Sequence, residues 1–355
     1  MPPSSKAISD ESSQGERYSR QVLFRPIGES GQQKLASATV AVIGCGATGA
    51  AAAALLARAG VGTQNAGGSL IVIDRDFVEE SNLQRQVLFD ESDARESLPK
   101  AEAARRKIAL LNSDIDVRAH VSDLNPANVH ELLASSDILL DATDNFETRY
   151  LINDYAIEQR RPWIYSAAIG AYAVTMNIIP GETACLACIF PEPPGGVVET
   201  CDTAGILNTA VNFAASIAVT EAIKFLIGAR EKMRQTLLSC DLWNSEWSQV
   251  SAAFPRPGCD ACESRDFRHL RGEGRPHITL CGRNSVQIHE HRRPIDFDAL
   301  QARLLPHGEV RFNQLLLRFT RGEHTLTVFA DGRAIIQGTT DPTLARSLYA
   351  RFIGS

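Results

Sequence analysis

Two Cys-x-x-Cys pairs are the most distinctive reactive groups of this sequence. Cys185 and Cys188 lie in ETACLACIF, and Cys259 and Cys262 lie in PRPGCDACES. A single pair is also compatible with a redox dithiol. Together the two pairs provide four thiolates, the number that a closed tetrahedral zinc site requires. We therefore expect a structural zinc that ties together two distant segments and leaves no coordination position for a substrate.

A glycine-rich turn supplies a second kind of chemistry. Gly44, Gly46 and Gly49 form Gly-x-Gly-x-x-Gly between an apolar run, residues 39–43, and an alanine-rich stretch. Glycines at these positions let backbone N–H groups approach a phosphate at a helix N-terminus. Asp74 ends the next apolar run, SLIVID, where a carboxylate can accept hydrogen bonds from a ribose. The pattern predicts a nucleotide site, although by itself it favours an NAD(P)- or FAD-binding oxidoreductase, and a turn that only packs is the alternative.

Three polar residues after Asp74 favour a different kind of nucleotide site from that of an oxidoreductase. Asn82 and Arg85 lie in SNLQRQ, and Lys100 follows in LPKAEAA. Two cations and an amide suit a triphosphate, whose charge must be neutralised while its α-phosphorus is attacked. Hydride transfer needs no such cluster. Each residue alone is also compatible with a solvated surface side chain.

Two carboxylates follow a further apolar run, in DILLDATDN. Asp141 and Asp144 are expected at the carboxyl edge of a parallel sheet, where such folds bind ligands. Magnesium takes one or two carboxylates together with phosphate oxygens. Asp144 is the expected magnesium ligand, because Asp141 still lies at the strand end, where it can cap the turn. An N-cap of the helix that follows is the alternative role for Asp144.

The elements that must position these groups predict an α/β protein. Apolar runs at residues 39–43, 69–74 and 137–141 alternate with helical stretches, as in a Rossmann-like doubly wound sheet. We expect a disordered tail over residues 1–16, a large α/β domain over 17–265 and a charged linker over 266–276. Residues 277–355 predict a small α+β domain with strands in HITLCGRNSVQI, EVRFNQLLLRFT and HTLTVFADGRAIIQG, helices in DFDALQARLL and PTLARSLYARFI, and a hairpin turn at ADGRA.

Composition restricts the class of protein. The chain has 355 residues, of which 44% are hydrophobic and 22% charged, with a net charge of −6. This acidity gives no electrostatic reason to expect a nucleic acid or an anionic membrane as a partner. No segment has about 18 uninterrupted apolar residues, so we expect no membrane span. A cytoplasmic protein is expected, in which eight cysteines are free, metal-bound or catalytic rather than paired in disulfides.

The ordered set of motifs resembles a known family. ERYSRQ, GCGATG, SNLQRQ, PKAEAA, DATDN, the two Cys-x-x-Cys pairs and TCDTAG run from Arg17 to Cys262. They are similar to the ThiF/MoeB/HesA family of ubiquitin-activating-like adenylyltransferases. The small domain after the linker resembles tails on some ThiF-like members, which favours thiamin over molybdopterin biosynthesis. It contains no rhodanese-like active-site cysteine loop.

The resemblance implies a reaction, its cofactors and its partners. Family members use ATP and Mg²⁺ to adenylate the C-terminal glycine of a small ubiquitin-like sulfur carrier, ThiS-like or MoaD-like, and release pyrophosphate. A homodimer and a sulfur donor such as a cysteine desulfurase or rhodanese are further implied partners. A different ubiquitin-like or peptide acceptor stays open.

The resemblance also assigns roles residue by residue. Asp74 binds the ribose, and Asp144 holds magnesium. The side chains that handle the phosphates are Asn82, Arg85 and Lys100. Arg20 reaches the partner subunit's ATP site. Cys201, in TCDTAG, matches a cysteine that can bond to the activated carrier, and a role as a small loop residue is the alternative.

Overall fold

The structure is a computed structural model, and its described residues form two units. These residues are 16–192, 204–273, 279–280, 285–288, 295–312, 316–329, 332 and 334–353. Unit 1 takes in residues 16–192 and 206–271, and unit 2 takes in 204–205 and 272–353. The boundary between them, after Arg271, lies inside the segment that we interpreted as a linker.

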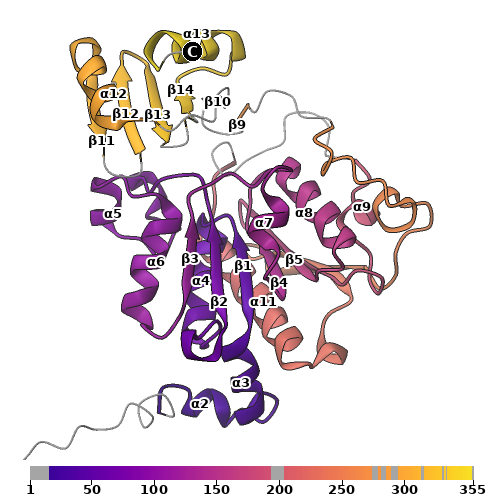
Figure 1. Cartoon of the computed structure of the whole chain (residues 1–355). Coiled ribbons are helices and arrows are strands. Elements are labelled where there is room, and N and C mark those ends of the chain that lie inside the picture. Colours follow the sequence, from indigo (N-terminus) through magenta and orange to yellow (C-terminus); the bar gives the residue numbers. More distant parts are fainter. Residues whose placement is uncertain are drawn as a thin grey trace, which may run out of the picture. The chain divides into compact units, whose positions relative to one another are not determined.

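An eight-stranded sheet organises unit 1 (Figure 1). Its order is β3-β2-β1-β4-β5-β6-β7-β8. The first five strands of this order are parallel, and β6, β7 and β8 join them antiparallel. The sheet is therefore mixed, and the expected doubly wound arrangement is correct only for its parallel part. The strands are β1 (Thr39–Ile43), β2 (Ser69–Ile73), β3 (Val117–His120), β4 (Ile138–Asp141), β5 (Trp163–Ile169), β6 (Tyr172–Ile178), β7 (Thr236–Asp241) and β8 (Glu246–Ser251).

Both faces of the parallel part are buried. Along β1, Val40 and Val42 belong to one apolar cluster, whereas Ala41 and Ile43 belong to another. Side chains alternate along a strand, so this division places one cluster on each face. The first cluster includes residues of α4, α6 and α11, and the second includes residues of α7, α8 and α9. The helices are α2 (Ser19–Val22), α3 (Gly28–Ser37), α4 (Ala47–Arg58), α5 (Glu91–Arg95), α6 (Lys100–Leu111), α7 (Val129–Leu133), α8 (Phe146–Glu158), α9 (Leu186–Ile189) and α11 (Asn208–Ile227), with short turns η1 (Gln64–Ala66), η2 (Glu80–Asn82), η3 (Arg230–Lys232) and η4 (Asp260–Ser264).

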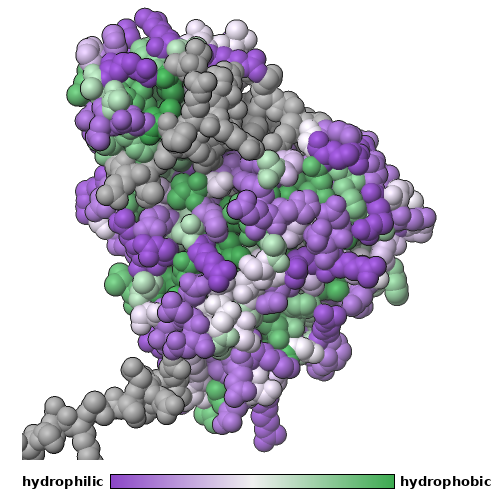
Figure 2. Space-filling model, in the orientation of Figure 1, coloured by the Kyte–Doolittle hydropathy of each residue, from purple (hydrophilic) through white to green (hydrophobic). Residues whose placement is uncertain are grey.

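Helix α11 is the one described helix that is long and apolar enough to cross a membrane. It packs on α4 and β5, however, and its buried residues include Ala214, Ala218 and Ala222. Small side chains on this stripe allow close packing against α4, which is itself rich in alanine. The composition of α11 is that of a core helix. The face drawn in Figure 2 is largely hydrophilic, with hydrophobic residues scattered among polar ones.

Unit 2 contains a second, antiparallel sheet with the order β11-β12-β13-β14-β10-β9. Helices α12 and α13 contribute Leu300, Leu304 and Tyr349 to its apolar core. The hairpin expected at ADGRA is confirmed, because β13 pairs antiparallel with β14 and Gly332 has a φ of +88°. Two expected strands are each divided in two. The elements are β9 (Thr279–Leu280), β10 (Ser285–Ile288), α12 (Phe297–Leu304), η5 (Leu305–His307), β11 (Glu309–Phe312), β12 (Leu316–Arg321), β13 (His324–Phe329), β14 (Ala334–Gln337) and α13 (Pro342–Phe352).

Candidate nucleotide site and cysteine cluster

The glycine turn leaves open space at the N-terminus of α4. Gly44 has a φ of +84°, and a Cβ on Gly49 would lie 1.9 Å from the Gly44 carbonyl oxygen. Both glycines are therefore required for the turn to close. Gly46 differs, because a Cβ built there meets nothing within 4 Å, and no side chain caps the helix that it starts. The first N–H groups of α4 can thus receive an anion.

Asp74 follows β2 and braces this turn. Its Oδ2 accepts a hydrogen bond from the Cys45 backbone N–H at 2.6 Å, and its Oδ1 accepts one from the Asp76 N–H at 2.7 Å. Burial raises the pKa of the Asp74 carboxyl, and the nearby Lys100 opposes that rise. The carboxylate keeps a second lone pair on each oxygen for a ribose hydroxyl.

Lys100 is buried, so its interpretation as a solvated surface cation is wrong. The residue is 2% exposed at the start of α6, and its Nζ lies 3.3 Å from Asp76 Oδ2. The Lys100 backbone N–H also donates to the Asp76 carbonyl at 2.8 Å. Sequence reasoning missed Asp76, although its place two residues after Asp74 at a strand end was a usable signal.

Asn82 and Arg85 lie in and after η2. Asn82 is 2% exposed, and its Oδ1 is buried without a hydrogen-bond partner among the described residues. A buried unpaired amide oxygen is costly and indicates that a donor is missing. Arg85 is half-buried and donates from Nη1 to the Ser81 carbonyl at 2.9 Å.

The two aspartates after β4 have different environments. Asp141 is fully buried; its Oδ1 accepts from Thr143 N and Oγ1, and its Oδ2 lies 3.3 Å from Arg149 Nε. Asp144 is exposed and has no hydrogen bond or ion pair with any described residue. It is not the N-cap of α8, because Asn145 takes that role by accepting from the Thr148 N–H.

Arg75 interacts electrostatically with carboxylates that follow β2 and β4. Its Nη1 lies 3.0 Å from Asp123 Oδ1. Burial lowers the pKa of the Arg75 guanidinium, but the surrounding carboxylates Asp123, Asp76, Asp144 and Asp74 outweigh that effect and raise it. Asp74 and Asp144 therefore share one charged edge of the sheet. This arginine was also missed from the sequence.

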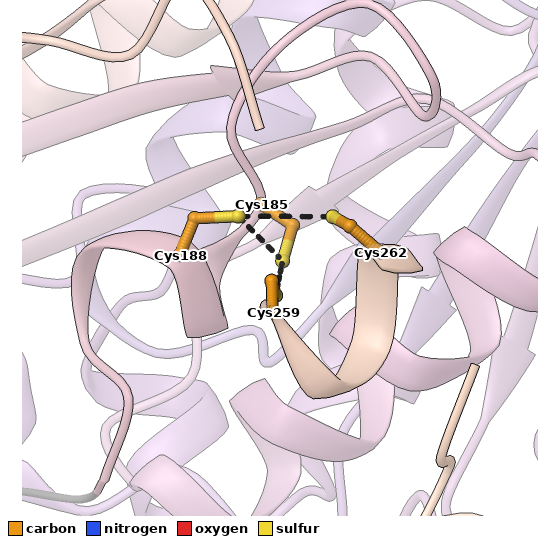
Figure 3. Close-up of side chains that lie close together, drawn as sticks. All are labelled: Cys185, Cys188, Cys259 and Cys262. Atoms are coloured by element: carbon orange, nitrogen blue, oxygen red, sulfur yellow. Dashed lines mark hydrogen bonds between the residues drawn. The ribbon is translucent and has the colours of Figure 1, made fainter. Parts of the chain in front are cut away.

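Four cysteine sulfurs converge where α9 faces η4 (Figure 3). The Sγ atoms of Cys185 and Cys188, of Cys185 and Cys259, and of Cys188 and Cys262 are each 3.7 Å apart. These distances are far too long for disulfides, and a zinc ion with bonds of about 2.3 Å would separate its thiolates by roughly 3.8 Å. The Arg256 N–H donates to the Cys188 sulfur at 3.2 Å, as expected for a sulfur that carries negative charge.

Arg20 lies away from the phosphate end of its own unit. It belongs to α2, which sits beside the carboxyl end of α4, the end opposite the glycine turn (Figure 1). A twelve-residue helix such as α4 is about 18 Å long. Arg20 therefore does not join the site that its own chain forms.

Four cysteines of the sequence lie outside this cluster. Cys45 and Cys240 are buried packing residues, and burial raises the pKa of both thiols. Cys201, like Cys281, lies outside the described residues, and its catalytic role stays a prediction.

Comparison with known proteins identifies the family. The ThiF family model matches residues 18–261. The chain belongs to the ThiF family. It is 44% identical over 342 residues to the sulfur carrier protein ThiS adenylyltransferase of Bacillus subtilis, which covers 95% of this chain and 99% of that protein. It is also 36% identical over 256 residues to the SAMP-activating enzyme E1 of Haloferax volcanii. That match covers 72% of this chain and 91% of the Haloferax protein.

Solved structures agree with this ThiF-family assignment. The crystal structure of E. coli MccB with ATP superposes with a TM-score of 0.59 at 25% identity, covering 69% of this chain and 74% of that one. The Bacillus protein also aligns with most of unit 2, since the match covers nearly the whole chain. The ThiF-like tail expected from the sequence is therefore shared with a ThiS adenylyltransferase.

Proposed function

We propose that this protein adenylates the C-terminal glycine carboxylate of a small ubiquitin-like sulfur carrier, with a ThiS-like protein as the acceptor. The observation that carries the proposal is the buried Lys100 ammonium, which interacts electrostatically with Asp74 and Cys45 beside an open helix N-terminus at Gly46. A triphosphate supplies the anion that this ammonium and the helix N–H groups can bind. The near full-length similarity to a ThiS adenylyltransferase supports this acceptor over a MoaD-like one.

The reaction joins two anions and needs no general base. The carrier carboxylate is already ionised at neutral pH, and one of its oxygens bonds to the α-phosphorus of ATP. The bond from that phosphorus to the bridging oxygen breaks, and pyrophosphate leaves with the electron pair. Lys100, Arg85 and the N–H groups of α4 stabilise the charge that develops on the phosphate oxygens. Asn82 donates to a phosphate oxygen, and Asp74 orients the ribose.

Magnesium and zinc have separate places in this proposal. Asp144 would hold magnesium, because its carboxylate is exposed and unpaired among the described residues, whereas Asp141 is committed to Arg149. Magnesium at this position would neutralise phosphate charge. Zinc would fill the cluster of Cys185, Cys188, Cys259 and Cys262, where it would be structural.

A homodimer completes the proposed site. Arg20 supplies a cation to the ATP site of a second copy, since its own site lies at the other end of α4. The protein is cytoplasmic in this proposal, and Cys201 stays a candidate for bonding to the activated carrier. A sulfur donor such as a cysteine desulfurase or rhodanese would act after adenylation.

Carrier-dependent exchange of labelled pyrophosphate into ATP tests the proposal. We expect exchange with a ThiS-like protein that ends in Gly-Gly and much less with a MoaD-like protein. An enzyme that binds ATP but exchanges with neither carrier would overturn the assignment. Tight binding of NAD without exchange would favour an oxidoreductase, which leaves the buried Lys100 unexplained.

A further inference from the structure

Helices α4 and α6 each have a distinct contact at either end. At their N-termini, α4 starts from Gly46 and α6 starts with Lys100, so both begin at the candidate nucleotide site. At their C-termini, both hold the N-terminal arm, which we define as residues 16–27 and which carries Arg20. The same two helices therefore link a chain's own phosphate site to the arm that it presents to a second copy.

Asn112, directly after α6, is the centre of this attachment. Its Nδ2 donates to the Tyr18 Oη at 2.8 Å and to the Ala57 carbonyl of α4 at 2.8 Å. Asn112 is 1% exposed, so the bond to Ala57 is buried and the bond to Tyr18 is partly buried. The Arg17 guanidinium adds a hydrogen bond to the Leu111 carbonyl at 3.1 Å.

Two glutamines attach the arm to the end of α4. The Nε2 atoms of Gln21 and Gln32 donate to the Ala59 carbonyl at 2.8 and 3.0 Å, and Gln21 also donates to Gln32 Oε1 at 2.6 Å. Gln21 is the next residue after Arg20. These bonds therefore set the position of the arginine's own backbone.

Gly60 allows the arm to approach this closely. Its φ is +79°, and a Cβ built on it would lie 2.6 Å from Tyr18 Cζ and 2.8 Å from Gln32 Nε2. Any larger residue at position 60 must therefore displace the Tyr18 ring, the glutamine, or both.

The free surface of the arm is suited to a second copy of this chain. Arg20 is exposed and has no hydrogen bond or ion pair with the described part of its own chain. Leu23 and Phe24, on the same arm, are 75% and 60% exposed. A cation beside two exposed apolar side chains, on an arm whose backbone is attached to the domain, is the pattern of an interface surface rather than of a solvated tail.

We propose that Asn112, Gln32 and Gly60 are positioning residues for catalysis in the partner subunit. They hold the arm so that Arg20 reaches the phosphates bound by a second copy, and this inference rests on the proposed adenylation by a homodimer. A change at Gly60 should therefore damage the partner's site while leaving its own chain's site competent.

A matched pair of glycine variants tests whether the attachment of the arm at Gly60 matters for catalysis. Gly60→Ala and Gly67→Ala impose the same backbone strain, because both glycines have a φ of +79°, but a Cβ on Gly67 meets nothing within 4 Å. We expect Gly60→Ala to lower kcat for carrier-dependent exchange by about tenfold or more, as expected when a transition-state cation is misplaced. Gly67→Ala should stay within about twofold of the wild type.

Mixed dimers show whether Gly60→Ala impairs the site of its own chain or that of the partner subunit. Gly60→Ala and Asp144→Ala chains carrying different affinity tags are coexpressed and purified as a mixed dimer. The Gly60→Ala chain keeps its own Asp144 and receives an intact arm from its partner, so one of the two sites is complete. We expect about half of the wild-type rate, far above either homodimer. Tyr18→Phe, a milder change that removes the acceptor of Asn112, should show the same rescue from a smaller defect.

The outcomes separate this inference from the proposed function. An unimpaired Gly60→Ala homodimer, or an impaired one without rescue in the mixed dimer, overturns the positioning role. A mixed dimer of Arg20→Ala and Asp144→Ala is the control for shared sites. If that pair is not rescued either, both the shared site and this inference fail, although carrier-dependent exchange by the wild type would still support adenylation.

Discussion

The cysteine cluster and the nucleotide site were both predicted from short motifs, yet the structure completes them to different extents. Four sulfurs from two segments lie within 4.8 Å of one another inside one unit. In contrast, the nucleotide edge keeps an unpaired Asn82 Oδ1, an exposed Asp144 and no contribution from Arg20 of the same chain. The cysteine cluster is thus complete within its own chain, whereas the nucleotide edge keeps polar groups that a bound ligand can satisfy.

Loss of a cysteine ligand should have the largest effect. Cys259→Ser should lose zinc and much of the stability of unit 1, because a structural zinc contributes on the order of 10 kcal/mol in small domains. Zinc content and thermal unfolding measure the change. Cys240→Ala is a matched control, since Cys240 is also buried but lies outside the cluster. A zinc-free Cys259→Ser protein with an unchanged melting temperature would contradict the structural role.

Substitutions of the two aspartates after β4 should have different effects, one on catalysis and the other on the stability of the fold. Asp144→Asn should lower kcat for pyrophosphate exchange by about 100-fold or more and leave the melting temperature unchanged. Asp141→Asn should instead destabilise the fold by roughly 3 kcal/mol, because it leaves Arg149 buried without its charged partner. Steady-state exchange kinetics and urea unfolding of both variants check this. An active Asp144→Asn enzyme would remove Asp144 from the site.

A smaller catalytic effect is expected at Asp76. Asp76→Asn removes the charge beside the buried Lys100 ammonium but keeps its backbone contacts. We expect kcat to fall by about tenfold, because the lysine is then less firmly held against the triphosphate. Exchange kinetics measured against ATP concentration provide the readout. The matched control is Glu80→Gln, at an exposed position of η2, which should leave kcat unchanged.

A pH-dependent effect on stability is expected from Asp154 of α8, which contacts the last residues of unit 1. Its Oδ2 accepts from the His269 N–H at 2.9 Å, and burial raises its pKa to about 7. Because the folded state then binds a proton that the unfolded state has released, the contribution of this carboxyl to stability is greatest below about pH 4 and declines as the pH rises towards 7. Asp154→Asn removes this dependence. Between pH 5 and pH 8 the wild type should lose roughly 2 kcal/mol more than the variant in urea unfolding; equal losses would rule out the raised pKa.

Local patterns in the sequence determined the elements and the members of the cysteine cluster. The apolar runs, the glycine turn and the Asp-Gly hairpin each encode a backbone conformation within a few residues, so β1, α4 and the β13–β14 hairpin could be predicted. Cysteine spacing likewise indicated which four sulfurs converge, because two Cys-x-x-Cys pairs have the spacing that a shared tetrahedral site requires. The mixed sheet was not predictable in this way, since strand direction depends on connections rather than on residue pattern.

Tertiary structure alone decided what each charged residue of the site does. Arg149 folds back onto Asp141 and makes no such ion pair with Asp144, and Lys100 is buried beside Asp76, twenty-four residues away. Asn112 holds Tyr18 across ninety-four residues and so turns Arg20 away from its own phosphate site. The protonation, burial and contacts of a charged side chain depend on all of its neighbours in space. Many of these neighbours are distant in the sequence, so no periodicity along the chain predicts them.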